Sequence, residues 1–319
     1  HQLYTAGMGT AANTLFVIGT KAVSVPTAMV LFNWLATLWG GKISFRLPMA
    51  WATAFLFVFM VGGLTGLVNA SSSVDRQFQD NMWVVGHFHW MVWSIVLAVL
   101  AGFLYWWPKI TGRMLNEKLG RASLWFTVLG AGGISGPMLV EGLMGMPRRV
   151  YTYLPEQGWG AFNAVATVSA LVMGVGIILL VVTWLESLIR GQRAAGDAWG
   201  DGRTLEWAVP SPAPAYNFAR LPMVEGRDAW WDAKVNRGGQ LQYAPEELDH
   251  GRHGDLIHMP SPSWMPALTA LGFLVAGFGG ILRNPTVALV GLVIVGLGIL
   301  GWALEDGRGY YLAVEEGDA

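Results

Sequence analysis

Long runs of apolar residues, separated by short polar stretches, make up most of the chain. A helix of about 20 mainly apolar residues is long enough to cross a lipid bilayer. The pattern predicts seven such membrane-spanning helices, at 10–39, 48–70, 83–108, 122–145, 160–188, 264–282 and 285–303. The predicted fold is therefore an all-α polytopic membrane protein.

The composition supports this prediction and excludes other classes. Of the 319 residues, 53% are hydrophobic and 13% charged, and a soluble domain carries about twice that charged fraction. The net charge of −1 gives no indication of a nucleic-acid partner. Because the chain has no cysteine, thiolate haem ligation, iron–sulfur clusters and thiolate copper centres are excluded within it. The first residue is His and no signal sequence precedes the first span, so we expect the later part of a longer chain.

Charge and proline content divide the chain into four predicted parts. Residues 1–190 hold five spans, and 191–262 form an extension rich in glycine, proline and charge, with an extended stretch at 207–214. Residues 263–304 form a hairpin of two spans, and 305–319 form an acidic tail. Basic residues gather in the loops after spans one, three and five, which the positive-inside rule places in the cytoplasm. The extension is then cytoplasmic, and the start of span three lies on the outer side.

Two histidines near the outer end of span three are the first candidate ligands. His87 and His89 are two residues apart, so they project about 200° apart around a helix. They cannot hold one metal together, but they can reach two metals on opposite sides of the helix. Ionisable groups inside a membrane helix are costly, which favours a functional interpretation. The alternative is a pair of histidines that only hydrogen-bond to neighbouring helices.

An arginine pair at the end of span four is predicted to lie at a similar depth. Arg148 and Arg149 follow the sequence Gly-Met-Pro at 145–147. Arginine binds carboxylates through two parallel hydrogen bonds, so the pair suits an acidic cofactor. The alternative is an interfacial pair that extends toward lipid headgroups.

These motifs, together with the segment 61–70 and the acids Asp75 and Asp80, resemble subunit I of the haem–copper oxidase superfamily over about residues 1–190. The resemblance implies the later helices of a twelve-helix bundle that binds two haems and copper. It gives His87 the role of proximal ligand of the high-spin haem, where catalysis occurs, and His89 that of an axial ligand of the low-spin haem. It implies that Arg148, Arg149 and Asp75 contact haem propionates and that Asp80 binds magnesium; for both acids the alternative is a solvated loop.

The N-terminal segment resembles the family's copper-binding sequence His-His-x-x-Thr-x-Gly-Met. Aligned on Thr5, Gly7 and Met8, His1 is the first copper ligand and Gln2 occupies the second ligand position. Glutamine is a poorer copper ligand than histidine. A second alignment places the missing histidine before His1, and the two alignments remain open.

Three positions depart from the family pattern or lie outside it. Val30 stands where many oxidases have a channel lysine, whereas Thr27 matches a polar position of the same proton channel. Gln79 stands where the magnesium site usually has a histidine. Nitric oxide reductases of the superfamily also lack that lysine, so they are the alternative. Glu141, near the end of span four, either relays protons or contacts water at the headgroups.

The C-terminal part resembles other oxidase segments. Residues 204–218 are similar to the C-terminal extension of bacterial subunits I, and 258–264 with the final hairpin are similar to a small accessory subunit, here fused. His250, His253 and His258 have no fixed spacing, which favours a solvated loop over a metal site.

The resemblance implies a subunit of a respiratory terminal oxidase that reduces dioxygen to water and couples this to proton translocation in the bacterial inner membrane. The implied partners are subunits II and III, with cytochrome c or a quinol as electron donor. A haem-free transporter or structural bundle is the remote alternative. The resemblance places further haem and copper ligands in earlier helices, so the chain alone is not expected to be active.

Overall fold

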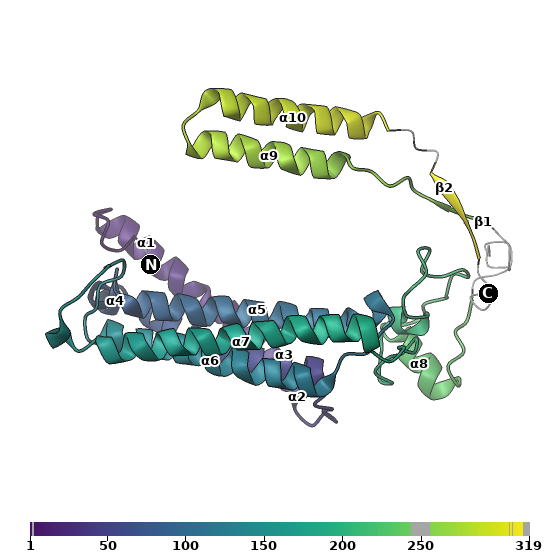
Figure 1. Cartoon of the computed structure of the whole chain (residues 1–319), viewed down its shortest axis with the longest axis horizontal. Coiled ribbons are helices and arrows are strands. Elements are labelled where there is room, and N and C mark those ends of the chain that lie inside the picture. Colours follow the sequence, from purple (N-terminus) through teal and green to yellow (C-terminus); the bar gives the residue numbers. More distant parts are fainter. Residues whose placement is uncertain (2, 244–255, 306, 308, 315–319) are drawn as a thin grey trace. The chain divides into compact units, whose positions relative to one another are not determined.

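The computed structural model describes residues 1, 3–243, 256–305, 307 and 309–314. The chain divides into two compact units, His1–Ala198 and Trp199–Ala319, and each is considered by itself. Helices dominate both units (Figure 1).

The first unit is built from long apolar helices with short connections. Its elements are α1 (Thr10–Ala22), α2 (Ser24–Leu38), α3 (Leu47–Asn69), α4 (Ser72–Phe78), α5 (Met82–Thr111), α6 (Glu117–Leu143), the 3₁₀ turn η1 (Pro155–Gln157) and α7 (Gly160–Arg190). The first predicted span is divided into two helices, α1 and α2, with Val23 between them.

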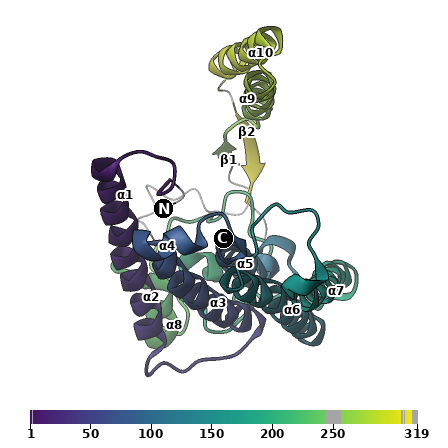
Figure 2. The same ribbon diagram turned by 90° about the vertical axis from the view of Figure 1, so that its left-hand side faces the viewer.

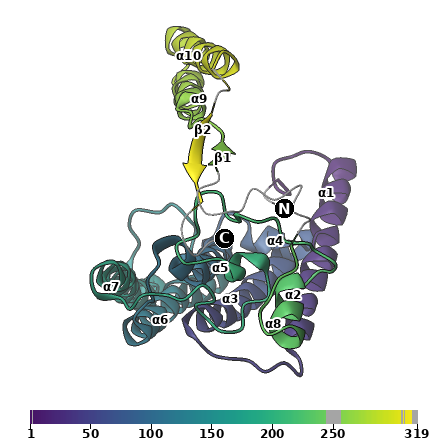
Figure 3. The same ribbon diagram turned by 90° about the vertical axis from the view of Figure 1, so that its right-hand side faces the viewer.

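The helices of this unit stand side by side in a row that runs from α2 through α3, α5 and α6 to α7 (Figures 2 and 3). The core between α3, α5 and α6 contains Trp51, Leu97, Leu104 and Leu124. Glycine lets α5 and α6 approach closely: a Cβ on Gly142 would lie 2.1 Å from the backbone nitrogen of Trp83. The exposed faces of the row are rich in Leu, Ile, Val and Phe, as lipid-facing surfaces are.

Six described helices are long and apolar enough to cross a membrane, with Thr10–Leu38 counted as one. The helix α9, over the sixth predicted span, has 17 residues, near the lower limit for crossing. The prediction of an all-α polytopic membrane protein is confirmed.

The second unit contains the turn η2 (Leu205–Ala208), α8 (Ala229–Asn236), β1 (Leu256–Met259), α9 (Met265–Ile281), α10 (Pro285–Ala303) and β2 (Tyr310–Ala313). The helices α9 and α10 form a hairpin, in which the Asn284 side chain caps α10 by accepting hydrogen bonds from the backbone of Thr286 and Val287. The strands pair antiparallel, with Leu256 opposite Ala313. The sequence predicted neither strand. It also predicted an extended conformation for 207–214, whereas the structure begins this stretch inside the turn η2.

Candidate haem-ligand site

Asn81 begins the helix that carries both histidines and joins it to α6. Its Oδ1 accepts a hydrogen bond from the Trp83 backbone at 2.8 Å, which caps α5. Its Nδ2 donates to the Gly142 carbonyl at 3.0 Å, at the end of α6. One side chain therefore fixes the start of α5 against the end of α6.

The turn that carries the arginine pair is held by backbone hydrogen bonds to the same place. Asn81 and Pro147 form an isolated antiparallel bridge, and the Met82 N–H donates to the Met146 carbonyl at 2.9 Å. The Arg148 N–H donates to the Asp80 carbonyl at 3.0 Å. The histidine helix and the arginine turn thus form one connected structure.

His87 is oriented by groups on α3. Its Nδ1 lies 3.0 Å from the Gly62 carbonyl and 3.0 Å from the Thr65 hydroxyl. A carbonyl only accepts, so Nδ1 carries the hydrogen and Nε2 has the free lone pair. Gly66 makes room for the ring, because a Cβ there would lie 2.9 Å from Cε1 of His87.

His89 is oriented in the same way by its own helix. Its Nδ1 lies 2.8 Å from the Val85 carbonyl, so the hydrogen is again on Nδ1 and the lone pair on Nε2. Histidines that bind metals usually donate their second ring nitrogen in this manner, which fixes the ring. The two side chains therefore fit two separate haem irons, each through Nε2.

His1 and Asp75 lie beside His87. The rings of His1 and His87 have centroids 6.4 Å apart, and His1 Nδ1 is 3.5 Å from the Asp75 carboxylate. The copper role of His1 stays a prediction. Asp75 is fully buried, not solvated, and its propionate role also stays a prediction.

Arg148 is half-buried and forms an ion pair with Asp80, whereas Arg149 is exposed and has a positive φ of 68°. Within the described ranges, no group of three His, Asp or Glu side chains is arranged to hold a metal. The described side chains provide no complete metal site around Asp80, so its magnesium role stays a prediction.

The other predicted residues lie away from this site or outside the described ranges. The Thr27 hydroxyl donates to the Val23 carbonyl of its own helix at 2.8 Å, and Val30 is exposed on α2. Gln2, His250 and His253 lie outside the described residues. His258 lies on β1 against the ring of Tyr311, with centroids 5.0 Å apart.

Two residues that orient the site were not singled out from the sequence. Thr65 lies inside the segment 61–70 that resembles the oxidase family, but nothing in the sequence alone assigns it a role. Asn81 directly precedes a helix, and an asparagine there is a recognisable capping signal. Its second bond, to Gly142, joins residues 61 positions apart and leaves no local pattern in the sequence.

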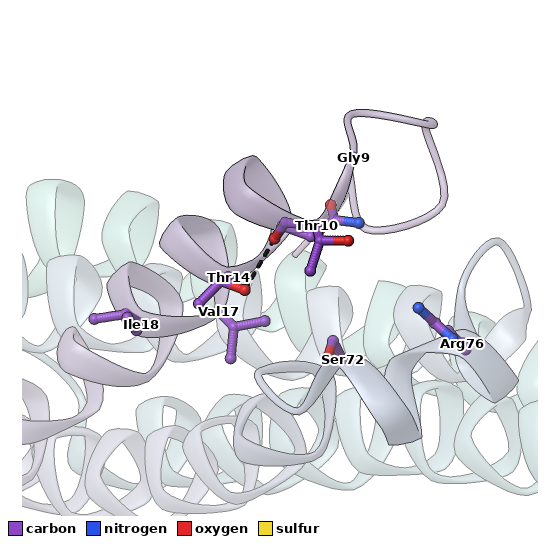
Figure 4. A pocket seen from close by; sticks show the side chains of 8 residues that line it. Gly9, Thr10, Thr14, Val17, Ile18, Ser72 and Arg76 are labelled. Carbon is purple, nitrogen blue, oxygen red and sulfur yellow. Dashed lines mark hydrogen bonds between the residues drawn. The ribbon is translucent and has the colours of Figure 1, made fainter.

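A cavity of about 380 Å³ lies between α1 and α4 (Figure 4). Its described lining is Gly9, Thr10, Asn13, Thr14, Val17, Ile18, Ser72 and Arg76, which does not include the histidines or the arginine pair. The cavity is therefore separate from the candidate site.

The fold and the site define a class: a multi-pass membrane protein with two separately oriented histidines on one helix beside an arginine pair. The family described as cytochrome c and quinol oxidase polypeptide I matches residues 1–173. The chain belongs to this family.

Among its relatives, cytochrome c oxidase subunit 1 of Bacillus sp. (strain PS3) is 42% identical over 322 residues, covering 99% of this chain and 51% of the relative. Quinol oxidase subunit 1 of Bacillus subtilis (strain 168) is 39% identical over 319 residues, covering 99% and 48%. The chain thus spans about half the length of these relatives, and their alignments extend through its C-terminal hairpin.

A solved structure described as a haem–copper terminal oxidase dimer matches 60% of this chain and 39% of its own, with a TM-score of 0.52 and 21% identity. At that identity the likeness concerns the fold alone. It agrees with the row of helices described above.

Proposed function

We propose that this chain supplies part of the catalytic subunit of a respiratory terminal oxidase, which reduces dioxygen to water and couples the reaction to proton translocation. The observation that carries the proposal is the orientation of His87 and His89. Each ring donates through Nδ1 to a backbone carbonyl and keeps Nε2 for a metal. The two rings are held by different elements, α3 for His87 and α5 itself for His89.

The residues of the chain have distinct roles in this proposal. Haem, when bound, would supply the reversible one-electron chemistry of iron at both histidines. Gly62 and Thr65 orient His87, the proposed high-spin haem ligand, and Val85 orients His89, the proposed low-spin haem ligand. Arg148 and Arg149 would bind propionate carboxylates, and the backbone bonds between 80–82 and 146–148 hold them at a fixed height relative to the histidines.

The proposal for the whole protein also includes copper, subunits II and III and an electron donor. The similarity to cytochrome c oxidases and to quinol oxidases is nearly equal, so the proposal names the donor as cytochrome c or a quinol. The nitric oxide reductase alternative gains no support from these relatives. Membership of the oxidase family counts against the haem-free alternative.

The experiment uses the purified complex with the full-length subunit and three variants, His87→Ala, His89→Ala and His258→Ala. Carbon monoxide binds only to a haem with an open coordination position. We expect His87→Ala to abolish the carbon monoxide difference spectrum and His89→Ala to abolish the low-spin haem signal. His258→Ala, in the second unit, should leave both signals unchanged.

Unchanged spectra in both haem-ligand variants would overturn the ligand assignment. Oxygen uptake with reduced cytochrome c and, separately, with a quinol then tests the reaction and its donor. Proton release from vesicles during turnover tests the coupling.

A further inference from the structure

Glu141 is a carboxylic acid that this chain encloses completely. It lies in the last turn of α6 with an exposed fraction of 0%. Both carboxylate oxygens are inaccessible, and neither has a hydrogen-bond partner among the described residues. Contact with water at the headgroups is excluded by this burial, which leaves the carboxyl group without an evident structural role.

The position of Glu141 on its helix explains the enclosure. Gly130 lies eleven residues earlier, within about 20° of the same helical face, and it packs directly against Met173 of α7. The next residue, Gly142, packs against Trp83 of α5. Glu141 thus lies on the α7-facing side of α6, next to the place where α6 meets α5.

Two other buried polar side chains of the same helix have partners within the chain, whereas the Thr127 hydroxyl has none among the described residues. The Ser123 hydroxyl donates to the Gly176 carbonyl at 2.7 Å, and the Ser135 hydroxyl donates to the Ala131 carbonyl at 2.7 Å. A buried carboxyl without a partner is destabilising, and an apolar side chain of similar size would fill the space without that cost. The unpartnered carboxyl therefore points to a ligand.

Only a small ligand fits. The chain alone already seals both oxygens, so a side chain from a further polypeptide segment would have to displace helices to reach them. A proton, with or without a water molecule, requires no such displacement. Between residues 160 and 185, α7 carries no ionisable side chain.

Charged groups lie close by along the chain. The Glu141 carbonyl accepts the Met146 N–H at 2.9 Å, at the base of the turn that presents Arg148 and Arg149. Arg148 pairs with Asp80, and its Nε is buried without a hydrogen-bond partner in the described part of the chain. On α5, His87 and His89 follow Trp83 by one to two turns. A change of charge on this side of the bundle would act on Glu141 through a medium that water screens weakly.

We propose that Glu141 is a proton-binding site in the outer half of the membrane-spanning helices. The carboxylate takes one proton from a hydronium ion, so that one O–H bond of that ion breaks, an O–H bond forms on Glu141 and a water molecule is left; the reverse step returns the proton. No electron is transferred in this step. Its link to the haem redox state rests on the proposed function, whereas the proton site does not.

The test is infrared difference spectroscopy on the purified complex, in H₂O and in D₂O. A protonated carboxyl gives a carbonyl band that moves to lower frequency on deuteration. Two kinds of spectrum are recorded, one for a step in pH and one for reduction of the haems. The variants are Glu141→Gln, which keeps the shape but holds no exchangeable acid proton, and Glu156→Gln, which alters an exposed acid.

We expect a deuterium-sensitive carboxyl band in both spectra that disappears in Glu141→Gln and persists in Glu156→Gln. If Glu141→Gln does not assemble, Glu141→Asp keeps an acid and should shift the band instead of removing it. A band seen only in the pH spectrum would retain the proton site and reject its link to the haems. A complex without haem would give no redox spectrum at all, which contradicts the proposed function separately. Absence of the band from both spectra, or its survival in Glu141→Gln, would overturn the proton site.

Discussion

The contact of α5 with α6 and the hairpin of α9 with α10 show the same close packing of helices at glycine, but they differ in the polar groups around it. In both, glycine lets two apolar helices touch backbone to backbone: a Cβ on Gly142 would lie 2.1 Å from the Trp83 nitrogen, and one on Gly279 would lie 2.2 Å from the Ala288 nitrogen. The hairpin buries only glycine and Val295. The contact of α5 with α6 adds the hydrogen bonds of Asn81 and encloses Glu141 nearby.

The hairpin helices α9 and α10 pack closely without a buried polar side chain. Small residues at helix contacts are a common solution in membranes. The Asn81 hydrogen bonds at the α5–α6 contact are an addition to such packing, and we interpret them as orienting the site. The predictions that follow separate packing from orientation.

The largest effect is expected from Gly142→Ala in the full-length subunit. The new Cβ must displace the backbone of α5, so we expect a cost of about 3 kcal/mol and loss of haem during assembly. Gly136→Ala is the matched control, since nothing lies within 4 Å of its Cβ position on the same helix. Haem content and the midpoint of thermal haem loss measure the difference. Equal behaviour of the two variants would contradict the described contact.

The corresponding change in the hairpin is Gly279→Ala, with Gly277→Ala as the control that has open space around it. We expect about 2 kcal/mol for Gly279→Ala, because the two helices can separate slightly about their short turn. The haem spectra should not change, since the hairpin contains none of the proposed ligands. A protease-protection assay on membranes would report the loosened hairpin, and altered haem spectra would refute its separation from the site.

Substitutions at Asn81 test how α5 is oriented against α6 without introducing a steric conflict. Asn81→Ala removes the cap of α5 and the bond to Gly142, for an expected cost of about 1–2 kcal/mol. Asn81→Asp keeps the capping oxygen and loses the donor to the Gly142 carbonyl, so it should recover roughly half of that cost. The thermal midpoint of the complex measures both. If the two variants lose equal stability, the capping oxygen contributes nothing, and if Asn81→Asp loses no stability, the bond to Gly142 contributes nothing.

The smallest effect is expected at Thr65. Thr65→Val removes the hydroxyl beside His87 Nδ1 and leaves the Gly62 carbonyl, so we expect about 1 kcal/mol and a shifted high-spin haem spectrum. Thr53→Val, whose hydroxyl bonds only to the Met49 carbonyl of its own helix, is the control and should leave the spectrum unchanged. A spectrum that is identical in all three proteins would remove Thr65 from the site.

Local signals in the sequence predicted most of the fold. Apolar length located the helices, and the spacing of His87 and His89 predicted that they face different partners. The arginine turn was also recognisable, because it follows Met-Pro after a glycine. The strands β1 and β2 were not predicted, since each has four residues and they pair across the whole of α9 and α10.

The burial of individual polar side chains could not be predicted from the sequence either. Glu141 lies near a predicted helix end, where exposure and enclosure are equally compatible with its position. Its burial depends on Gly130 and Gly142, which draw α7 and α5 close on either side. Asp75 was ambiguous for the same reason, and its proximity to His1 arises from the tertiary structure.

The strand pair has a consequence for how such a chain is modified in evolution. Because β1 and β2 flank the hairpin and pair with each other, the polypeptide enters and leaves α9–α10 at one place. Two crossings by this hairpin, as the sequence predicts, would return the chain to the side from which it departed. A module of this kind can be joined to a membrane protein, or removed from it, without inverting the sidedness of any helix that precedes it.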